Sequence, residues 1–137
     1  MKCALSAVWP NNDFQNRFDV TLAPGHDPEP DGWGVVATLI GIDKDSMIAK
    51  MRADFAIAIA EGNQGLCDGL NDVSATLEDG FVEIENVYLD EFIVHMDPTE
   101  FLRMLDWRIS IIESDDYTNP DGKFESIVLE YETIPFE

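Results

Sequence analysis

The segment VSATLEDGFVEIENVY, residues 73–88, decides the fold of this chain. Residues 73–77 and 81–88 alternate apolar and polar side chains, which is typical of β-strands with one buried face. The Glu-Asp-Gly sequence between them is typical of a turn, so the segment predicts a β-hairpin. In the second arm Val82 and Ile84 point to one face, and Glu83 and Glu85 point to the other.

Two helices are predicted on either side of this hairpin, over residues 45–61 and 98–113. The segment Asp97-Pro98-Thr99-Glu100 combines an N-cap acid, a proline at the first helical position and a carboxylate at the third. Both segments carry apolar residues at helical spacing. These residues are Ile48, Met51, Phe55 and Ile59 in the first helix, and Phe101, Leu105, Ile109 and Ile112 in the second.

The other apolar segments predict strands. They are residues 2–9, 18–22, 33–42, 89–96 and 124–134, of which 33–42 is expected to be a central strand buried on both faces. Residues 24–32 and 62–72 are rich in Gly, Asn, Asp or Pro and predict loops. Because no βαβ repeat alternates along the chain, we expect an α+β fold in one globular domain, residues 1–137. It would have a mainly antiparallel sheet of about six or seven strands, with both helices packed on one face.

The net charge of −20 is the strongest functional indication, with 28 acidic residues against 8 Lys and Arg. A small domain needs a net charge of only about 2–8 in magnitude to remain soluble, and excess like charge destabilises a compact fold. Residues 1–68 hold ten acids and five bases, whereas residues 69–137 hold eighteen acids and three bases. The excess therefore belongs to the second half and predicts a basic partner.

Clusters of acids and aromatic rings in that half are the candidate partner-binding residues. They are Glu83, Glu85, Tyr88, Asp90, Glu91, Asp115, Asp116, Tyr117 and Asp121, with Trp107 as a further anchor at a helix edge. If the Glu83–Glu85 arm lies beside the final strand, its carboxylates and those of that strand form a two-dimensional acidic patch. A solvated surface and adaptation to high salt are the alternative interpretations of the charge.

No sequence pattern indicates catalysis, a metal or a cofactor, so we expect a protein that is not an enzyme. Phosphate-binding, dinucleotide-binding and hydrolase motifs are absent from the sequence. Asp27, Glu29 and Asp31 match only the first half of a calcium loop, whose twelfth position is Thr38. The histidines and cysteines, His26, His95, Cys3 and Cys67, lack zinc-site spacing. We expect both cysteines to be reduced thiols, with a single disulfide between them as the alternative.

These observations predict a cytoplasmic, acidic, stoichiometric inhibitor that binds a basic protein and covers its active or nucleic-acid-binding site. A bacterial immunity protein that neutralises a toxin, such as a nuclease, fits best, because nucleases need basic clefts. The alternatives are a phage-encoded nucleic-acid mimic acting on a host defence complex in an anti-CRISPR-like way, a small carboxylate- or metal-dependent enzyme, and an acidic structural subunit. Direct binding to nucleic acid or to a membrane is not expected, and homo-oligomerisation is left open.

Overall fold

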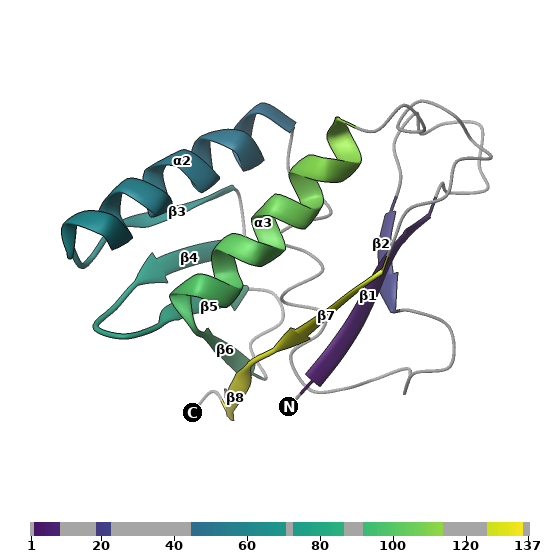
Figure 1. Ribbon diagram of the computed structural model, residues 1–137. Helices are drawn as coiled ribbons and strands as arrows, with labels where there is room; N and C mark the ends of the chain where they lie inside the picture. The colour runs from purple at the N-terminus through teal and green to yellow at the C-terminus, as the bar shows by residue number, and fades with distance from the viewer. Residues whose placement is uncertain are drawn as a thin grey trace.

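The computed structural model describes residues 2–8, 19–22, 45–70, 73–86, 92–113 and 126–135. In chain order the elements are β1 (Lys2–Val8), β2 (Asp19–Leu22), α2 (Asp45–Glu61), β3 (Cys67–Leu70), β4 (Val73–Leu77), β5 (Val82–Asn86), β6 (Phe92–Met96), α3 (Pro98–Ile112), β7 (Ile127–Glu130) and β8 (Glu132–Pro135). The α+β class, the two helices and the antiparallel pairing are confirmed (Figure 1).

The described strands form two antiparallel sheets, where the sequence predicted one sheet of six or seven strands. Five strands are arranged in the order β3-β4-β5-β6-β8, and three in the order β2-β1-β7. The predicted final strand is divided at Tyr131, because β7 pairs with β1 whereas β8 pairs with β6. The predicted central strand over 33–42 and the predicted loop over 24–32 lie outside the described residues.

Strand β3 corrects the prediction that residues 62–72 form a loop. Its sequence, Cys-Asp-Gly-Leu, has little preference for a strand, but Cys67 to Leu70 pair in register with Val73 to Thr76 of β4. The backbone hydrogen bonds of this ladder determine the conformation, and tertiary pairing overrides the local preference. Because β3 is the outermost strand in the sheet order, it needs pairing on one side only.

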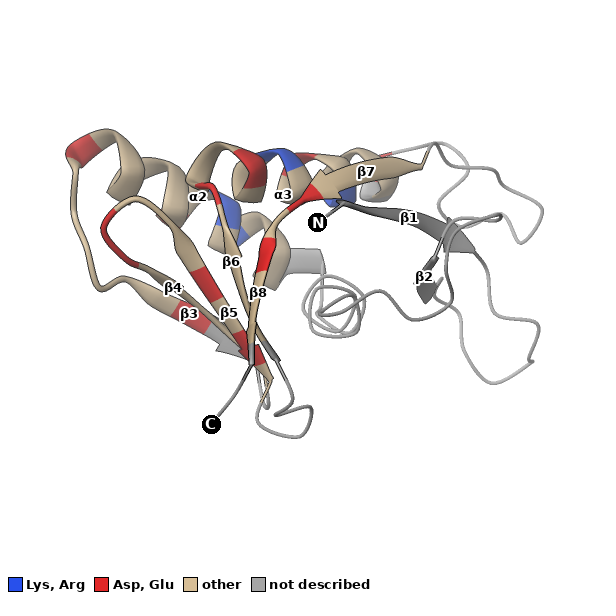
Figure 2. Cartoon of the chain, turned by 90° about the horizontal axis from the view of Figure 1, so that it is seen from below, with Lys and Arg blue, Asp and Glu red and all other residues tan. Residues whose placement is uncertain are grey.

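The core lies between the helices and one face of the five-stranded sheet. Alternate residues of β4 and β5 are buried, and they cluster with buried residues of α2, α3 and β7. In Figures 1 and 2 both helices lie on the same side of this sheet. The rings of Phe55 on α2 and Phe101 on α3 pack with centroids 4.7 Å apart, which joins the two helices at the centre of the core.

Helix α3 begins as the sequence predicts but buries a different stripe. The Asp97 side chain accepts a hydrogen bond from the Thr99 backbone N–H at 2.8 Å, with Pro98 in the first turn. The buried residues are Phe101, Met104, Leu105, Arg108 and Ile111, while the predicted Ile109 is only partly buried. The side chain of Ile112 is not described.

The buried stripe of α3 follows the i, i+3, i+4, i+7 pattern of a helix with a period of 3.6 residues. That pattern brings Arg108 into the core, with 3% of its surface exposed. Apolar periodicity alone does not predict a buried arginine. Neither of the described helices is long and apolar enough to cross a membrane.

Candidate acidic interface

The second face of the five-stranded sheet carries the candidate site, which we call the outward face. Cross-strand pairing places its residues in two rows, and Phe81 precedes Glu83 on the same side of the β5 arm. One row contains Cys67, Thr76, Glu83, His95 and Glu132. Beside it on the same face, Gly69 pairs with Ser74 and Ser74 with Glu85, and Ile93 pairs with Ile134. The opposite face is buried in the core, so the side chains of the outward face are the more exposed ones of the described sheet.

His95 lies at the centre of the outward face, directly across from Glu83 on β5 and from Glu132 on β8. Its Nε2 lies 3.2 Å from Oε1 of Glu83, within hydrogen-bond distance. Its ring stacks on Phe81 with the centroids 4.2 Å apart and the planes 23° apart. These contacts on adjoining strands fix the orientation of both rings and of the Glu83 carboxylate.

Apolar side chains lie beside the carboxylates on this face. Ile93 is directly across from Ile134, and Ile134 is 40% exposed. Glu83 and Glu85 are two residues apart on one strand, which places them about 7 Å apart. Glu132 lies two strands away from Glu83, or about 10 Å. The outward face therefore combines carboxylates about 7 to 10 Å apart with a pair of isoleucines.

The outward face has no Lys or Arg among its described residues. Figure 2 shows Asp and Glu but no Lys or Arg on the coloured parts of the five-stranded sheet, whereas the basic residues in colour lie on the helices. The described contacts of the outward-face glutamates therefore include no Lys or Arg of this sheet. The negative charge of this face is left for interaction with a group outside the sheet.

The helices carry acids as well, and there Lys50, Arg52 and Arg103 each pair with a carboxylate. Lys50 contacts Asp54 at 2.6 Å and Asp68 at 3.9 Å, and Arg52 of α2 contacts Asp106 of α3 at 2.7 Å. The hydrogen bond to Asp54, together with the negative charges of Asp68 and Asp54, raises the pKa of Lys50. The hydrogen bond to Asp106 raises the pKa of Arg52.

A third pair joins α3 to β7. The Arg103 Nε donates to Oε1 of Glu100 at 2.5 Å, and its Nη2 donates to the carbonyl of Val128. Oε2 of Glu100 accepts the backbone N–H of Glu130 at 2.9 Å. The Arg103 hydrogen bond, supported by the Glu130 N–H, lowers the pKa of Glu100 although burial opposes this. Arg103 and Glu100 therefore bind backbone groups on the edge of β7, groups that have no neighbouring strand in the described sheet.

The structure describes two of the predicted partner-binding residues, Glu83 and Glu85, and places them on one face as the alternation predicted. The predicted patch is corrected in one respect: β5 and the final strand are not neighbours, because β6 lies between them. His95 therefore separates Glu83 from Glu132. The other predicted residues lie outside the described part of the chain: Tyr88, Asp90, Glu91, Asp115, Asp116, Tyr117 and Asp121.

Sequence reasoning did not include Phe81, Ile93 and Ile134 among the candidate interface residues, and it included Glu132 only as one of the carboxylates of the final strand. Their common signal is position: each lies on the side of its strand opposite the buried residues, which alternation reveals once the pairing is known. Trp107, a predicted anchor, is partly buried and packs against the core cluster.

Cys67 is an exposed free thiol that accepts a hydrogen bond from the Thr76 hydroxyl at 3.3 Å. Within the described ranges, no three His, Cys, Asp or Glu side chains are grouped so that they could hold a metal ion. A scan of protein-family models, a search of curated proteins and a search of solved structures each find no match to this chain.

Proposed function

We propose that this protein is an acidic stoichiometric inhibitor that docks its outward face on a basic protein and covers that protein's active or nucleic-acid-binding site. The observation that carries the proposal is the charge of this face, where Glu83, Glu85 and Glu132 are accompanied by no described Lys or Arg. In this proposal the helices cover the inner face of the five-stranded sheet, and the partner binds the outward face. A toxin-neutralising immunity protein of a bacterium is the setting that fits this mechanism best.

The arrangement supports recognition of a folded protein more than imitation of a nucleic acid. Duplex DNA presents a dense, regular array of phosphates. On the outward face the carboxylates are interleaved with His95 and with the Ile93–Ile134 pair. Complementary charge accelerates encounter and selects the partner, and partly exposed apolar groups supply contacts that lose water on binding. A nuclease with a basic cleft meets both requirements.

A pair of matched variants tests the proposal. The test variant carries Glu83→Gln, Glu85→Gln and Glu132→Gln, and the control carries Asp79→Asn, Glu113→Gln and Glu130→Gln. Both remove three charges, but the control positions lie in the hairpin turn, at the end of α3 and on β7, where each residue is exposed. Each protein is used as bait in lysate of the source cell at low and high salt, with mass spectrometry and activity assays of what is retained.

We expect wild type and control to retain the same basic protein at 1:1 and to block its activity. The test variant should bind it about tenfold more weakly, which corresponds to about 0.5 kcal/mol for each glutamate removed. Equal losses in both variants, or a broad set of basic proteins released together by salt, would show that net charge acts without a specific face. Competition by nucleic acid for the same partner site is expected if the partner is a nuclease.

A further inference from the structure

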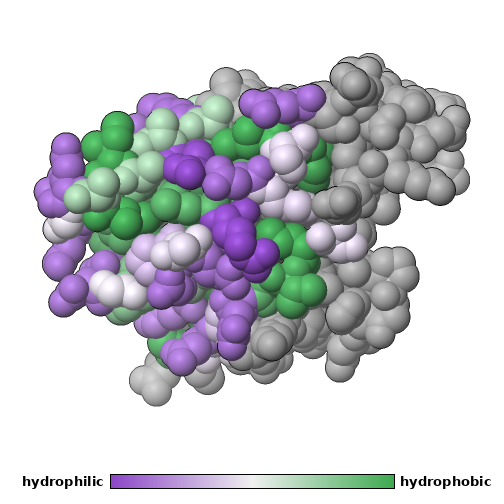
Figure 3. All heavy atoms as spheres, viewed as in Figure 1, coloured by the Kyte–Doolittle hydropathy of each residue, from purple (hydrophilic) through white to green (hydrophobic). Residues whose placement is uncertain are grey.

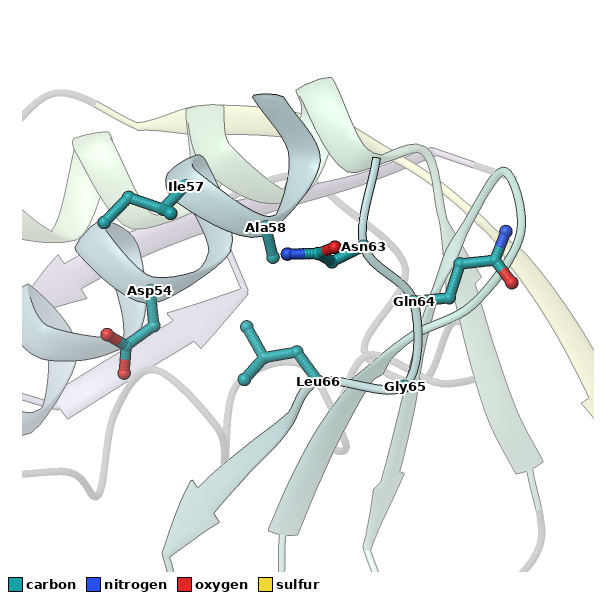
Figure 4. Close-up of a pocket in the computed structure, with 7 residues that line it drawn as sticks. All are labelled: Asp54, Ile57, Ala58, Asn63, Gln64, Gly65 and Leu66. Carbon is teal, nitrogen blue, oxygen red and sulfur yellow. The ribbon is translucent and has the colours of Figure 1, made fainter. Parts of the chain in front are cut away.

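A groove of about 490 Å³ lies at the end of α2. The helix lines one side with Asp54, Ile57 and Ala58, and the loop over 62–66 lines the other, where Leu66 faces the helix (Figure 4). Asp54, Ile57, Ala58 and Glu61 are spaced i, i+3, i+4 and i+7, so they share one side of the helix. Asp54, Ile57 and Ala58 line the groove, and Glu61 lies one turn beyond them, outside the lining but hydrogen-bonded to the lining residue Asn63.

The centre of the groove is apolar and accessible. Ile57 is 56% exposed, more than any other large hydrophobic residue that the structure describes. Ala58 is buried beside it, and Leu66 packs against the core cluster, so the floor of the groove is continuous with the core. Figure 3 shows hydrophobic side chains at the surface over this end of α2 next to hydrophilic ones. The groove is open to solvent, so an apolar side chain placed here would be removed from water on the side that faces Ile57 and Leu66.

Backbone hydrogen bonds hold both walls of the groove. Gly62, with φ +72°, ends the helix in a Schellman arrangement: its N–H donates to Ile59 at 3.2 Å and that of Asn63 donates to Ala58 at 2.9 Å. On the far side of the loop, the Gly65 N–H donates to Leu77 at 2.7 Å, and the Leu77 N–H donates to Leu66 at 2.7 Å. The groove is therefore formed before any ligand binds, which limits the entropy lost on binding.

The charge around the groove favours a cation at the Glu61 end. Asp54, at the other end, is paired with Lys50. Glu61 closes α2, whose last turn contains no basic residue, so the negative end of the helix dipole and the carboxylate add together. Asn63 donates from its side-chain amide to Oε2 of Glu61 at 3.0 Å, which orients the carboxylate toward the loop side.

We infer that this groove is a second docking point on the basic partner and receives a segment in which a large aliphatic or aromatic side chain is followed by Arg or Lys. The apolar side chain contacts Ile57 and Leu66, and the cation contacts Glu61. This inference rests on the proposed function for the identity of the partner, but not for the chemistry of the groove. Leu66 packs toward the core whereas the next residue, Cys67, belongs to the outward face, so the groove and the outward face lie on two sides of the outermost strand β3.

Short capped dipeptides test the chemistry of the groove without the partner. The probe is N-acetyl-leucyl-arginine amide, and the comparison probes are N-acetyl-leucyl-glutamine amide and N-acetyl-glycyl-arginine amide. Binding is measured on the 15N-labelled full chain from backbone amide shifts. We expect shifts confined to residues 54–66, with leucyl-arginine binding about fivefold more tightly than either comparison probe. Equal affinities for all three, or shifts elsewhere on the chain, would overturn the inference.

Two variants and a matched control locate the site. Ile57→Ser should abolish binding of the leucyl probes, and Glu61→Gln should remove the preference for arginine over glutamine. Ile134→Ser, a similar change at an exposed isoleucine of the outward face, should leave all probe affinities unchanged. In the partner assay, Ile57→Ser should weaken binding several-fold. If the probes bind but no basic partner is found, the proposed function is wrong and the inference about the groove is supported. If a basic partner binds but the probes do not, only the inference about the groove is wrong.

Discussion

The helices and the outward face differ in how their carboxylates are paired with basic side chains. On the helices Lys50, Arg52 and Arg103 each contact a carboxylate, and one of these pairs also binds backbone groups of β7. On the outward face the described glutamates are accompanied by one histidine and by no Lys or Arg. The comparison shows that net charge is a poor guide to a binding surface, because acids that are paired within the fold contribute to stability and leave little charge for a partner.

The largest effect that separates the two regions is expected from Glu100→Ala. This change removes the partner of Arg103 and leaves the Glu130 N–H without its acceptor. The cost should be about 2 kcal/mol of the free energy of unfolding, since hydrogen bonds to charged groups contribute about 1.5–3 kcal/mol each and part is recovered through water. Urea unfolding of wild type and Glu100→Ala measures this change in the free energy of unfolding. Glu113→Ala, at the exposed end of α3, is the control and should change stability by less than about 0.5 kcal/mol.

The same carboxylate predicts how stability depends on pH. Because Arg103 and the Glu130 N–H lower the pKa of Glu100 below its ordinary 4.5, the unfolded chain binds its proton more readily than the folded chain. This contribution is fully present above pH 4.5 and is lost as pH falls through the lower folded value. Urea unfolding of wild type and Glu100→Gln from pH 7 to pH 3 should show a difference that is constant at high pH and shrinks below 4.5. A constant difference throughout would contradict the pairing.

Local signals predicted the two helices and the β4–β5 hairpin, because caps, turn residues and periodicity act over short distances. Pairing between distant segments was not predictable in this way. The division of the last strand at Tyr131 depends on β1 and β6, which lie far away in the sequence. The same holds for the site: alternation predicted the orientation of Glu83, whereas its neighbour across the sheet, His95, depends on strand order.

A smaller effect is expected from the pair that joins the two helices, Arg52 and Asp106. Both side chains are substantially exposed, at 30% and 57%, so water screens their attraction. A double-mutant cycle with Arg52→Ala and Asp106→Ala should give a coupling of about 0.5 kcal/mol at low salt. The coupling should nearly vanish at about 1 M salt, where the Debye length is about 3 Å. A coupling that persists in high salt would indicate that the pair is less exposed in solution.

The smallest effect on stability is expected on the outward face, and it is the result that most sharpens the comparison. Glu85→Gln and Glu132→Gln remove carboxylates that contact no Lys or Arg among the described residues of the sheet. Each should change the free energy of unfolding by less than about 0.5 kcal/mol, and a small gain at low salt is expected from reduced repulsion. Urea unfolding and partner binding should be measured on the same samples. Loss of binding with unchanged stability assigns these carboxylates to recognition, whereas a loss of more than about 1 kcal/mol would place them, like Glu100, within the network that stabilises the fold.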